Sequence, residues 1–358
     1  MNRPETIMNS PKNGGVKWQL MIILIIVVVL LILLDLGLGS VRIPTSEVAR
    51  ILLGQPTENE AWQAIILKIR LPRTITAILA GAALSVGGLQ MQTLFRNPLA
   101  GPSVLGITAG ASLGVAAVML AAGTATTAFT VRQLGLGGSW LIILAATVGA
   151  ALVLLAILAI SYKIRDNVVM LIVGIMVANI TIAIVSIWQY FSDPEQIQEY
   201  IFWTFGSLGG VTADQLSILS IIVVFGIFMT FLLSKTLNAL LLGEDYAQSM
   251  GLNIRRSRIG VILVTSILAG SITGFCGPIG FVGIAVPHLT RSFLNTSDHK
   301  VLIPSCVLVG AILMLFCDII SQVPGSNTVL PVNAITAMIG SPIVIWIIVK
   351  RRNLKSSF

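Results

Sequence analysis

Long apolar runs without a charged side chain are the feature that most constrains this chain. Residues 20–34 and 139–160 contain no Asp, Glu, Lys or Arg. Unpaired backbone groups are costly in lipid, so runs of about 20 such residues cross a membrane as helices. Only 10% of all residues are charged, whereas soluble domains have about 25%. The sequence therefore predicts an all-α polytopic membrane protein, and the unbroken runs lack the alternation typical of a β-barrel.

About ten transmembrane helices are expected along the chain, together with one short helix outside the membrane at 194–206, which begins at Pro194 after the cap residue Asp193. The eighth predicted helix is short and contains Pro287, which suggests a half-helix or a tilted one. The chain then forms a single transmembrane domain over 18–352, with short tails at 1–17 and 353–358. The ten expected helices lie near 18–38, 74–94, 103–122, 139–160, 168–191, 213–234, 259–276, 280–294, 301–321 and 332–350.

The basic residues indicate the orientation of these helices. The net charge of +8 does not indicate nucleic-acid binding, because the charges form short clusters between the apolar runs. With both termini in the cytoplasm, most basic residues fall on the inner side, as the positive-inside rule requires. The outer side then carries only Arg42, Arg50, Lys68, Arg70, Arg73 and Arg132. Most of these lie in the first external loop, which is a plausible docking surface.

Catalytic and metal-binding patterns are missing from the sequence. It contains no phosphate-binding loop for ATP, no nucleophile elbow and no His/Cys/carboxylate cluster with metal-ligand spacing. Of the two histidines, His288 fits a structural role better than a proton relay. The three cysteines lie in apolar stretches and are expected to be small buried hydrophobes. We therefore predict a protein that is not an enzyme and binds no metal or cofactor of its own.

Two acidic residues stand in or at the ends of predicted spans. Asp35 falls near the external interface, where we expect it to be solvated. Asp318 lies near the external end of the ninth helix, where it either pairs with an Arg or lines a cavity. An ion-driven secondary transporter would carry more buried charges and inverted repeats. An intramembrane enzyme would carry a nucleophile and base within a helix. Both alternatives fit the sequence less well.

Three segments are more distinctive than the rest. The first comprises Arg70-Leu71-Pro72-Arg73, which presents two arginines at the outer water interface at a helix start, a stretch of small residues at 81–88, and Asn97-Pro98. The small residues allow close contact between helices. The second, residues 242–256, reads as a short amphipathic cytoplasmic helix. Ala247, Met250 and Leu252 recur at helical spacing there and suit insertion into a groove of another protein.

The third segment is rich in Gly and Pro, at 277–288, with 330–336 and 339–342 following it. Such a density indicates broken or tightly packed helices. In their order and spacing, the three segments resemble the permeases of type II ABC importers that take up iron–siderophores, haem and cobalamin. The resemblance covers residues 20–352. It implies the type II permease fold, a prokaryotic cell-membrane location and import of an iron–siderophore, with haem or cobalamin as the alternative.

The resemblance also implies partners and site residues. The partners are a second permease subunit, two ATPase subunits that bind the ATP, and an external binding lipoprotein or periplasmic protein; no nucleic acid is expected. Arg70 and Arg73 match outward arginines that dock the binding protein, and Asp166 and Asn167 match a cytoplasmic gate. The coupling helix at 243–252, which contacts the ATPase, comprises Gly243, Glu244, Asp245, Ala247, Gln248, Ser249, Met250, Gly251 and Leu252.

Two positions depart from the family pattern. Gln322 stands where many members carry an Arg for docking, and Asn333 ends a Val-Leu-Pro-Val-Asn run that many members write Glu-Leu-Pro-Val-Gly. A different permease chain that supplies the missing charge would explain the first change. We therefore expect a heterodimer rather than a homodimer, although both remain possible from the sequence.

Overall fold

The computed structural model describes residues 14–57, 59–121, 136–161, 167–323 and 328–351, and every regular element in these ranges is helical. Seven helices are long and apolar enough to cross a membrane, and two shorter apolar helices lie at Ile107–Leu120 and Val332–Trp346. Together with the half-length α14 (Val282–Leu294), they match the ten predicted helices. The others are α1 (Gly14–Gly37), α4 (Leu71–Leu94), α5 (Ile107–Ala116), α7 (Leu136–Ser161), α8 (Asn167–Phe191), α10 (Ala213–Leu232), α13 (Ile254–Cys276), α15 (His299–Ser321) and α16 (Val332–Arg351).

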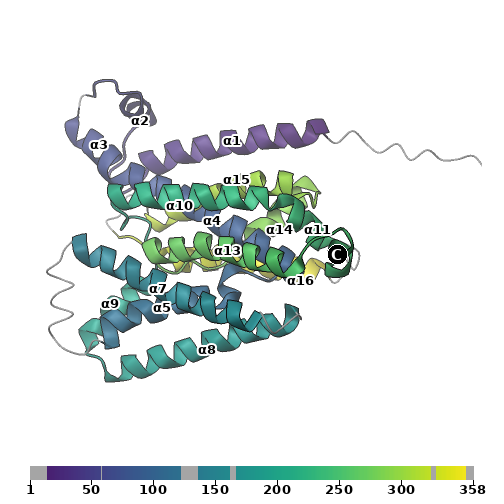
Figure 1. Ribbon diagram of the computed structural model, residues 1–358. Helices are drawn as coiled ribbons and strands as arrows, with labels where there is room; N and C mark the ends of the chain where they lie inside the picture. Colours follow the sequence, from purple (N-terminus) through teal and green to yellow (C-terminus); the bar gives the residue numbers. More distant parts are fainter. Residues whose placement is uncertain (1–13, 58, 122–135, 162–166, 324–327, 352–358) are drawn as a thin grey trace, which may run out of the picture.

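Helix α4 forms the centre of the bundle and buries most of its residues. It packs against α10, α13, α14 and α15, which surround it in Figure 1. Small residues permit this close approach, as the sequence predicted. A Cβ atom on Gly81 would lie 2.1 Å from the carbonyl oxygen of Gly310 in α15, and one on Gly88 would lie 1.8 Å from that of Gly283 in α14.

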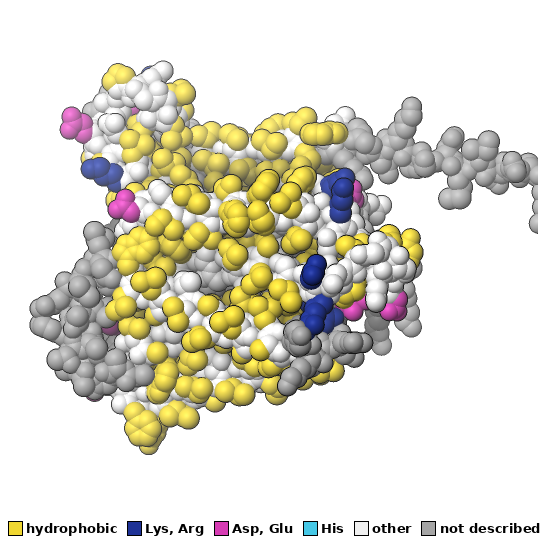
Figure 2. Space-filling view, viewed as in Figure 1, with side chains coloured by type: hydrophobic (Ala, Val, Ile, Leu, Met, Phe, Trp, Pro, Cys, Tyr) yellow, Lys and Arg dark blue, Asp and Glu magenta, His cyan; other side chains and the backbone are white. Residues whose placement is uncertain are grey.

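The outer surface of the bundle is apolar. Yellow hydrophobic side chains cover most of the face shown in Figure 2, while the Lys and Arg side chains gather mainly near one end. Helix α10 exposes large side chains such as Phe225 and Phe228, and α8 exposes Ile180 and Ile182. A soluble monomer rarely exposes apolar patches of this extent. The surface suits contact with lipid tails or with other membrane subunits.

The first external segment is helical, although the sequence predicted a loop. Helix α2 (Thr45–Leu52) is followed by α3 (Glu60–Ile65), and a turn of π-helix (Ile66–Arg70) joins α3 to α4 without a break. The helical stretch that contains Pro72 thus begins well before the predicted start at 74. Proline has no backbone N–H to donate within a helix. A turn of π-helix is one of the irregularities that accommodate it.

Short helices lie at both ends of the bundle. Helix α9 (Pro194–Thr204) begins after Asp193 with a capping box, which confirms the predicted helix at 194–206. At the other end, α11 (Ser234–Leu241) and α12 (Glu244–Ser249) follow α10. The start of α1 and the last described residues of the chain lie at this same end, and α2 and α3 lie at the opposite end (Figure 1). We call these the inner and the outer end, according to the distribution of basic residues.

Candidate functional site

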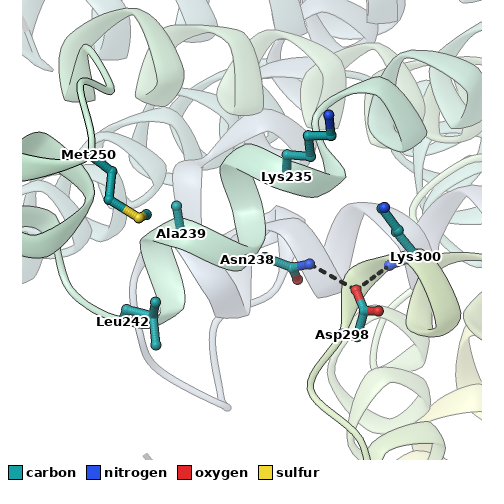
Figure 3. Close-up of a pocket in the computed structure, with 7 residues that line it drawn as sticks. All are labelled: Lys235, Asn238, Ala239, Leu242, Met250, Asp298 and Lys300. Atoms are coloured by element: carbon teal, nitrogen blue, oxygen red, sulfur yellow. Dashed lines mark hydrogen bonds between the residues drawn. The ribbon is translucent and has the colours of Figure 1, made fainter.

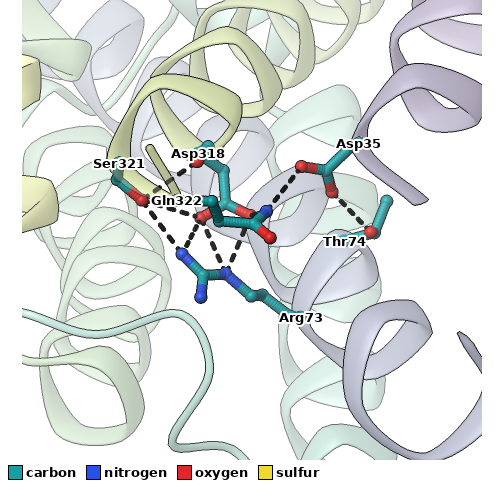
Figure 4. Close-up of polar contacts among 6 residues, drawn as sticks. All are labelled: Asp35, Arg73, Thr74, Asp318, Ser321 and Gln322. Carbon is teal, nitrogen blue, oxygen red and sulfur yellow. Dashed lines mark hydrogen bonds and ion pairs between the residues drawn. The ribbon is translucent and has the colours of Figure 1, made fainter. Parts of the chain in front are cut away.

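A buried cluster of polar side chains lies at the outer end, where α1, α4 and α15 meet (Figure 4). The Arg73 guanidinium donates to Asp318 through Nε (2.9 Å) and Nη2 (2.7 Å to Oδ1), and Nη2 also donates to Ser321 Oγ (2.9 Å). The Asp318 side chain is completely buried and that of Arg73 is 13% exposed. The pairing of Asp318 with an Arg, one of the two roles expected from the sequence, is therefore confirmed.

Gln322 connects the two acidic residues of this cluster. Its amide nitrogen donates to Asp35 Oδ1 (3.0 Å) and to Asp318 Oδ2 (3.1 Å). Asp35 also accepts from the Thr74 hydroxyl (2.5 Å) and is only 1% exposed. The expectation that Asp35 is solvated was wrong, because α4 and α15 cover the end of α1. We call Asp35, Arg73, Thr74, Asp318, Ser321 and Gln322 the outer cluster.

Arg70 also points into the protein. Its guanidinium donates to the carbonyl oxygens of Leu36 (2.7 Å) and Val41, and the residue is 6% exposed. The backbone at Gly39 passes so close that a Cβ there would lie 2.7 Å from Arg70 Nη2. Both arginines were expected at the water interface; for Arg70 this was wrong, whereas Arg73 is partly exposed. Arg70 holds the end of α1, and Arg73 holds α15. Their docking role stays a prediction.

A second candidate surface lies at the inner end, around α12. Gly243 and Gly251 flank this helix with φ angles of +117° and +86°, values that favour glycine. The predicted amphipathic helix is present, but the outward face differs from the predicted one. Ala247 is completely buried and Leu252 packs against the same apolar core. The apolar side chains that point outward are Leu242, Tyr246 and Met250, which are 61%, 53% and 51% exposed. We call these three the inner surface.

The remaining residues of this segment support the inner surface or face water. Glu244 accepts from Arg258 Nη2 of α13 (2.9 Å), which ties α12 to a membrane-spanning helix. Asp245, Gln248 and Ser249 are exposed. Leu242 and Tyr246 were not among the apolar positions singled out from the sequence. Leu242 is the C-cap of α11, and the break at Gly243 separates it from Tyr246 and Met250 of α12, so no single helical period relates the three residues.

A hollow of about 320 Å³ adjoins the inner surface (Figure 3). In that figure the side chains of Lys235 and Lys300 flank Asn238, whose amide donates to Asp298 (2.8 Å). This hydrogen bond lowers the pKa of Asp298 below its ordinary value, because it stabilises the ionised carboxylate. The lining residues are Lys235, Asn238, Ala239, Leu242, Met250, Asp298 and Lys300.

The predicted cytoplasmic gate cannot be placed. Asp166 lies outside the described residues, and Asn167 is the first residue of α8, where only the backbone is described. Within the described ranges, no group of three or more His, Cys, Asp or Glu side chains is arranged to hold a metal ion.

Comparison with known proteins identifies the family to which this chain belongs. A model of the FecCD transport family matches residues 24–350. The chain belongs to this family. It is 33% identical to the hemin transport system permease protein of Yersinia pestis, across 90% of this chain and 94% of that protein. It is 34% identical to the vitamin B12 import system permease protein of Salmonella typhi, across 80% and 84%.

A solved structure agrees with this assignment. The FecCD-family chain superposes with a TM-score of 0.80 and 26% identity on an inward-facing putative metal-chelate type ABC transporter, covering 93% of this chain and 99% of that one. The resemblance found in the sequence is thus confirmed, and so is the type II importer permease fold. The chain is a multi-pass permease of an ABC importer.

Proposed function

We propose that this permease imports an iron–siderophore across a prokaryotic cell membrane. The relatives are named for hemin and vitamin B12, and the solved structure for a metal chelate. Each of these cargoes is a metal ion held by a large organic ligand, and a ferric siderophore belongs to the same chemical class. Haem or cobalamin is the second candidate cargo, and the names of the two relatives favour it.

The exposed inner surface supports the proposal that separate subunits supply the energy for transport. Leu242 at the end of α11, with Tyr246 and Met250 of α12, exposes apolar side chains at the end that carries most of the basic charge. Exposed apolar groups with a polar surround are typical of protein contacts. Because the sequence contains no phosphate-binding loop, we propose that separate ATPase subunits bind here and that the bond between Glu244 and Arg258 helps to transmit their motion.

The other partners follow from the same proposal. Exposed apolar side chains of α8 and α16, such as Ile180 and Met338, suit a second permease subunit. At the outer end, partly exposed Arg73 and the exposed cations Arg42 and Lys68 suit an acidic binding protein. Asp166 and Asn167 remain the proposed gate.

Transport by the assembled complex tests the cargo. The permease would be reconstituted in vesicles with the ATPase and binding protein that co-purify with it, and uptake of a ⁵⁵Fe-siderophore, ⁵⁵Fe-hemin and ⁵⁷Co-cyanocobalamin would be compared. We expect ATP-dependent uptake of the siderophore, at least about tenfold above the other two, which corresponds to about 1.4 kcal/mol of discrimination. Preference for hemin or cyanocobalamin would select the second candidate. Uptake without ATPase subunits would contradict the proposal.

Replacing Tyr246 and Met250 together with Ser tests the inner surface. We expect the double variant to lose at least about tenfold in affinity for the ATPase, because apolar side chains at the centre of an interface dominate binding. Co-purification from membranes measures the loss. Leu53→Ser at the outer end is the control, since Leu53 is 74% exposed and belongs to neither surface. Full recovery of the ATPase with the double variant would remove α12 from the contact.

A further inference from the structure

A chain of hydrogen bonds runs from the half-buried Asn238 at the inner end to the buried central helix. Asn238 of α11 accepts at Oδ1 from the backbone N–H of His299 (2.9 Å) and lies 2.7 Å from its ring Nδ1. The other ring nitrogen, Nε2, lies 2.8 Å from the hydroxyl of Thr93 in α4. His299 and Thr93 are both completely buried. The side chain of His299 in α15 therefore contacts both α11 and α4, which are far from it in sequence.

The hydrogen bonds define the orientation of the Asn238 amide and the tautomer of His299. The Asn238 amide nitrogen donates to Asp298 Oδ1 (2.8 Å), so its oxygen faces His299. An amide oxygen only accepts, so the hydrogen between the two side chains belongs to Nδ1 of His299. Nε2 is then the acceptor of the ring, and the Thr93 hydroxyl lies 2.8 Å both from it and from the carbonyl oxygen of Leu89. A shift of α11 relative to α15 would break the bonds of Asn238 and leave Nδ1 of the buried His299 ring unpaired, which is unfavourable.

Thr93 belongs to a polar turn of α4 that contacts the surrounding helices. The side chain of Gln90 donates to Thr230 of α10 and accepts from Thr265 of α13 (2.7 Å). Gln92 donates to the carbonyl oxygen of Ile284 in α14 (3.1 Å) and accepts from Arg291 (2.6 Å). Gln90, Gln92 and Thr93 are all completely buried. This turn therefore connects α4 to α10, α13, α14 and α15.

At its Asn238 end, this series of hydrogen bonds leads directly to the inner surface. Asn238 stands one helical turn before Leu242, the first residue of that surface. Arg96, just beyond the end of α4, donates to the carbonyl oxygen of Leu241 (3.3 Å). A displacement of α11 and α12 would strain both this contact and the one between Asn238 and His299.

We infer that Asn238, His299 and Thr93 are positioning residues that transmit movement of the ATPase-binding helices to α4. The inference rests on the proposed docking of an ATPase at α12. It adds the route by which that docking reaches the centre of the bundle. None of the three residues contacts the ATPase or the cargo in this scheme.

Hydrogen–deuterium exchange of the permease–ATPase complex, with and without a non-hydrolysable ATP analogue, tests the inference without requiring the cargo. In the wild type, the analogue is expected to change exchange in residues 238–252 and in 86–98. In Thr93→Val, which keeps the size of the side chain and removes the hydroxyl, the change in 238–252 should remain. The change in 86–98 should fall by about threefold or more, the size typical of altered coupling.

Two further variants separate coupling from folding. Thr93→Ser restores the hydroxyl and should restore the response in 86–98. Thr273→Val removes a buried hydroxyl that donates within its own helix, to the carbonyl oxygen of Ala269 (2.8 Å), and should leave the response unchanged. An undiminished response of 86–98 in Thr93→Val, or an equal loss in Thr273→Val, would overturn the inference and leave His299 with a purely structural role. Failure of the ATPase to bind the wild type would instead contradict the proposed function.

Discussion

Arg73 and Asp318 show how one ion pair can hold two helices together at the outer end. Both side chains are largely removed from water, and each satisfies the other with more than one hydrogen bond. Gln322 adds a neutral amide that donates to both Asp318 and Asp35. Gln322, which stands where many family members carry an Arg, thus joins α1 to α15, and its part in docking stays a prediction.

Removing one member of the buried pair should be costly. We expect Arg73→Gln to destabilise the protein by about 3–5 kcal/mol, because Asp318 would keep its burial and lose its cation. Unfolding of the detergent-solubilised protein by heat or denaturant measures this. Arg50→Gln is the control, since the Arg50 side chain is 54% exposed and pairs with Glu47 on the surface, where such pairs contribute about 0–1 kcal/mol. An equally small loss for both variants would show that the Arg73–Asp318 pair does not stabilise the fold.

At the scale of the elements, α4 determines how the bundle packs. Its small residues let α14 and α15 approach to backbone contact, and its inner turn carries Gln90, Gln92 and Thr93 toward its neighbours. Association of helices in lipid depends on close packing and polar contacts, because lipid tails are as apolar as the side chains. An added methyl group at a contact point should therefore disturb the helix pair more than an added methyl group in open space.

Gly88→Ala and Gly260→Ala provide this comparison. A Cβ on Gly88 meets the backbone of Gly283, whereas no atom lies within 4 Å of a Cβ on Gly260. We expect Gly88→Ala to cost at least about 1–3 kcal/mol through overpacking, and Gly260→Ala to be neutral or stabilising by up to about 1 kcal/mol. The fraction of protein that stays monodisperse after heating in detergent reports both. Equal behaviour of the two variants would argue against backbone contact between α4 and α14.

At the scale of the whole molecule, the two ends of the bundle face different compartments. The outer end presents α2, α3 and the outer cluster, and the inner end presents α11, α12 and most of the basic residues (Figures 1 and 2). An importer that receives cargo on one side and energy on the other requires such a division. The orientation itself follows from the positive-inside rule.

Labelling of single cysteines checks this orientation. We expect Leu53→Cys to react with a membrane-impermeant maleimide in intact spheroplasts, and Tyr246→Cys to react only after permeabilisation, because the two positions lie at opposite ends and are 74% and 53% exposed. The native Cys276, Cys306 and Cys317 are buried, so the unmodified protein serves as the background control. The reverse pattern would place the ATPase-binding end outside and exclude an ATP-driven importer.

The sequence by itself determined the fold class, the ten spanning helices, the family and the existence of a helix near 243–252. Apolar runs, basic clusters and Gly/Pro motifs are local properties of the chain, and the bilayer gives them a direct structural meaning. Only the tertiary structure decided where Asp35, Arg70 and Arg73 point and which face of α12 is exposed. Those outcomes depend on which helices approach one another, and burial by a neighbour far away in sequence leaves no local signal.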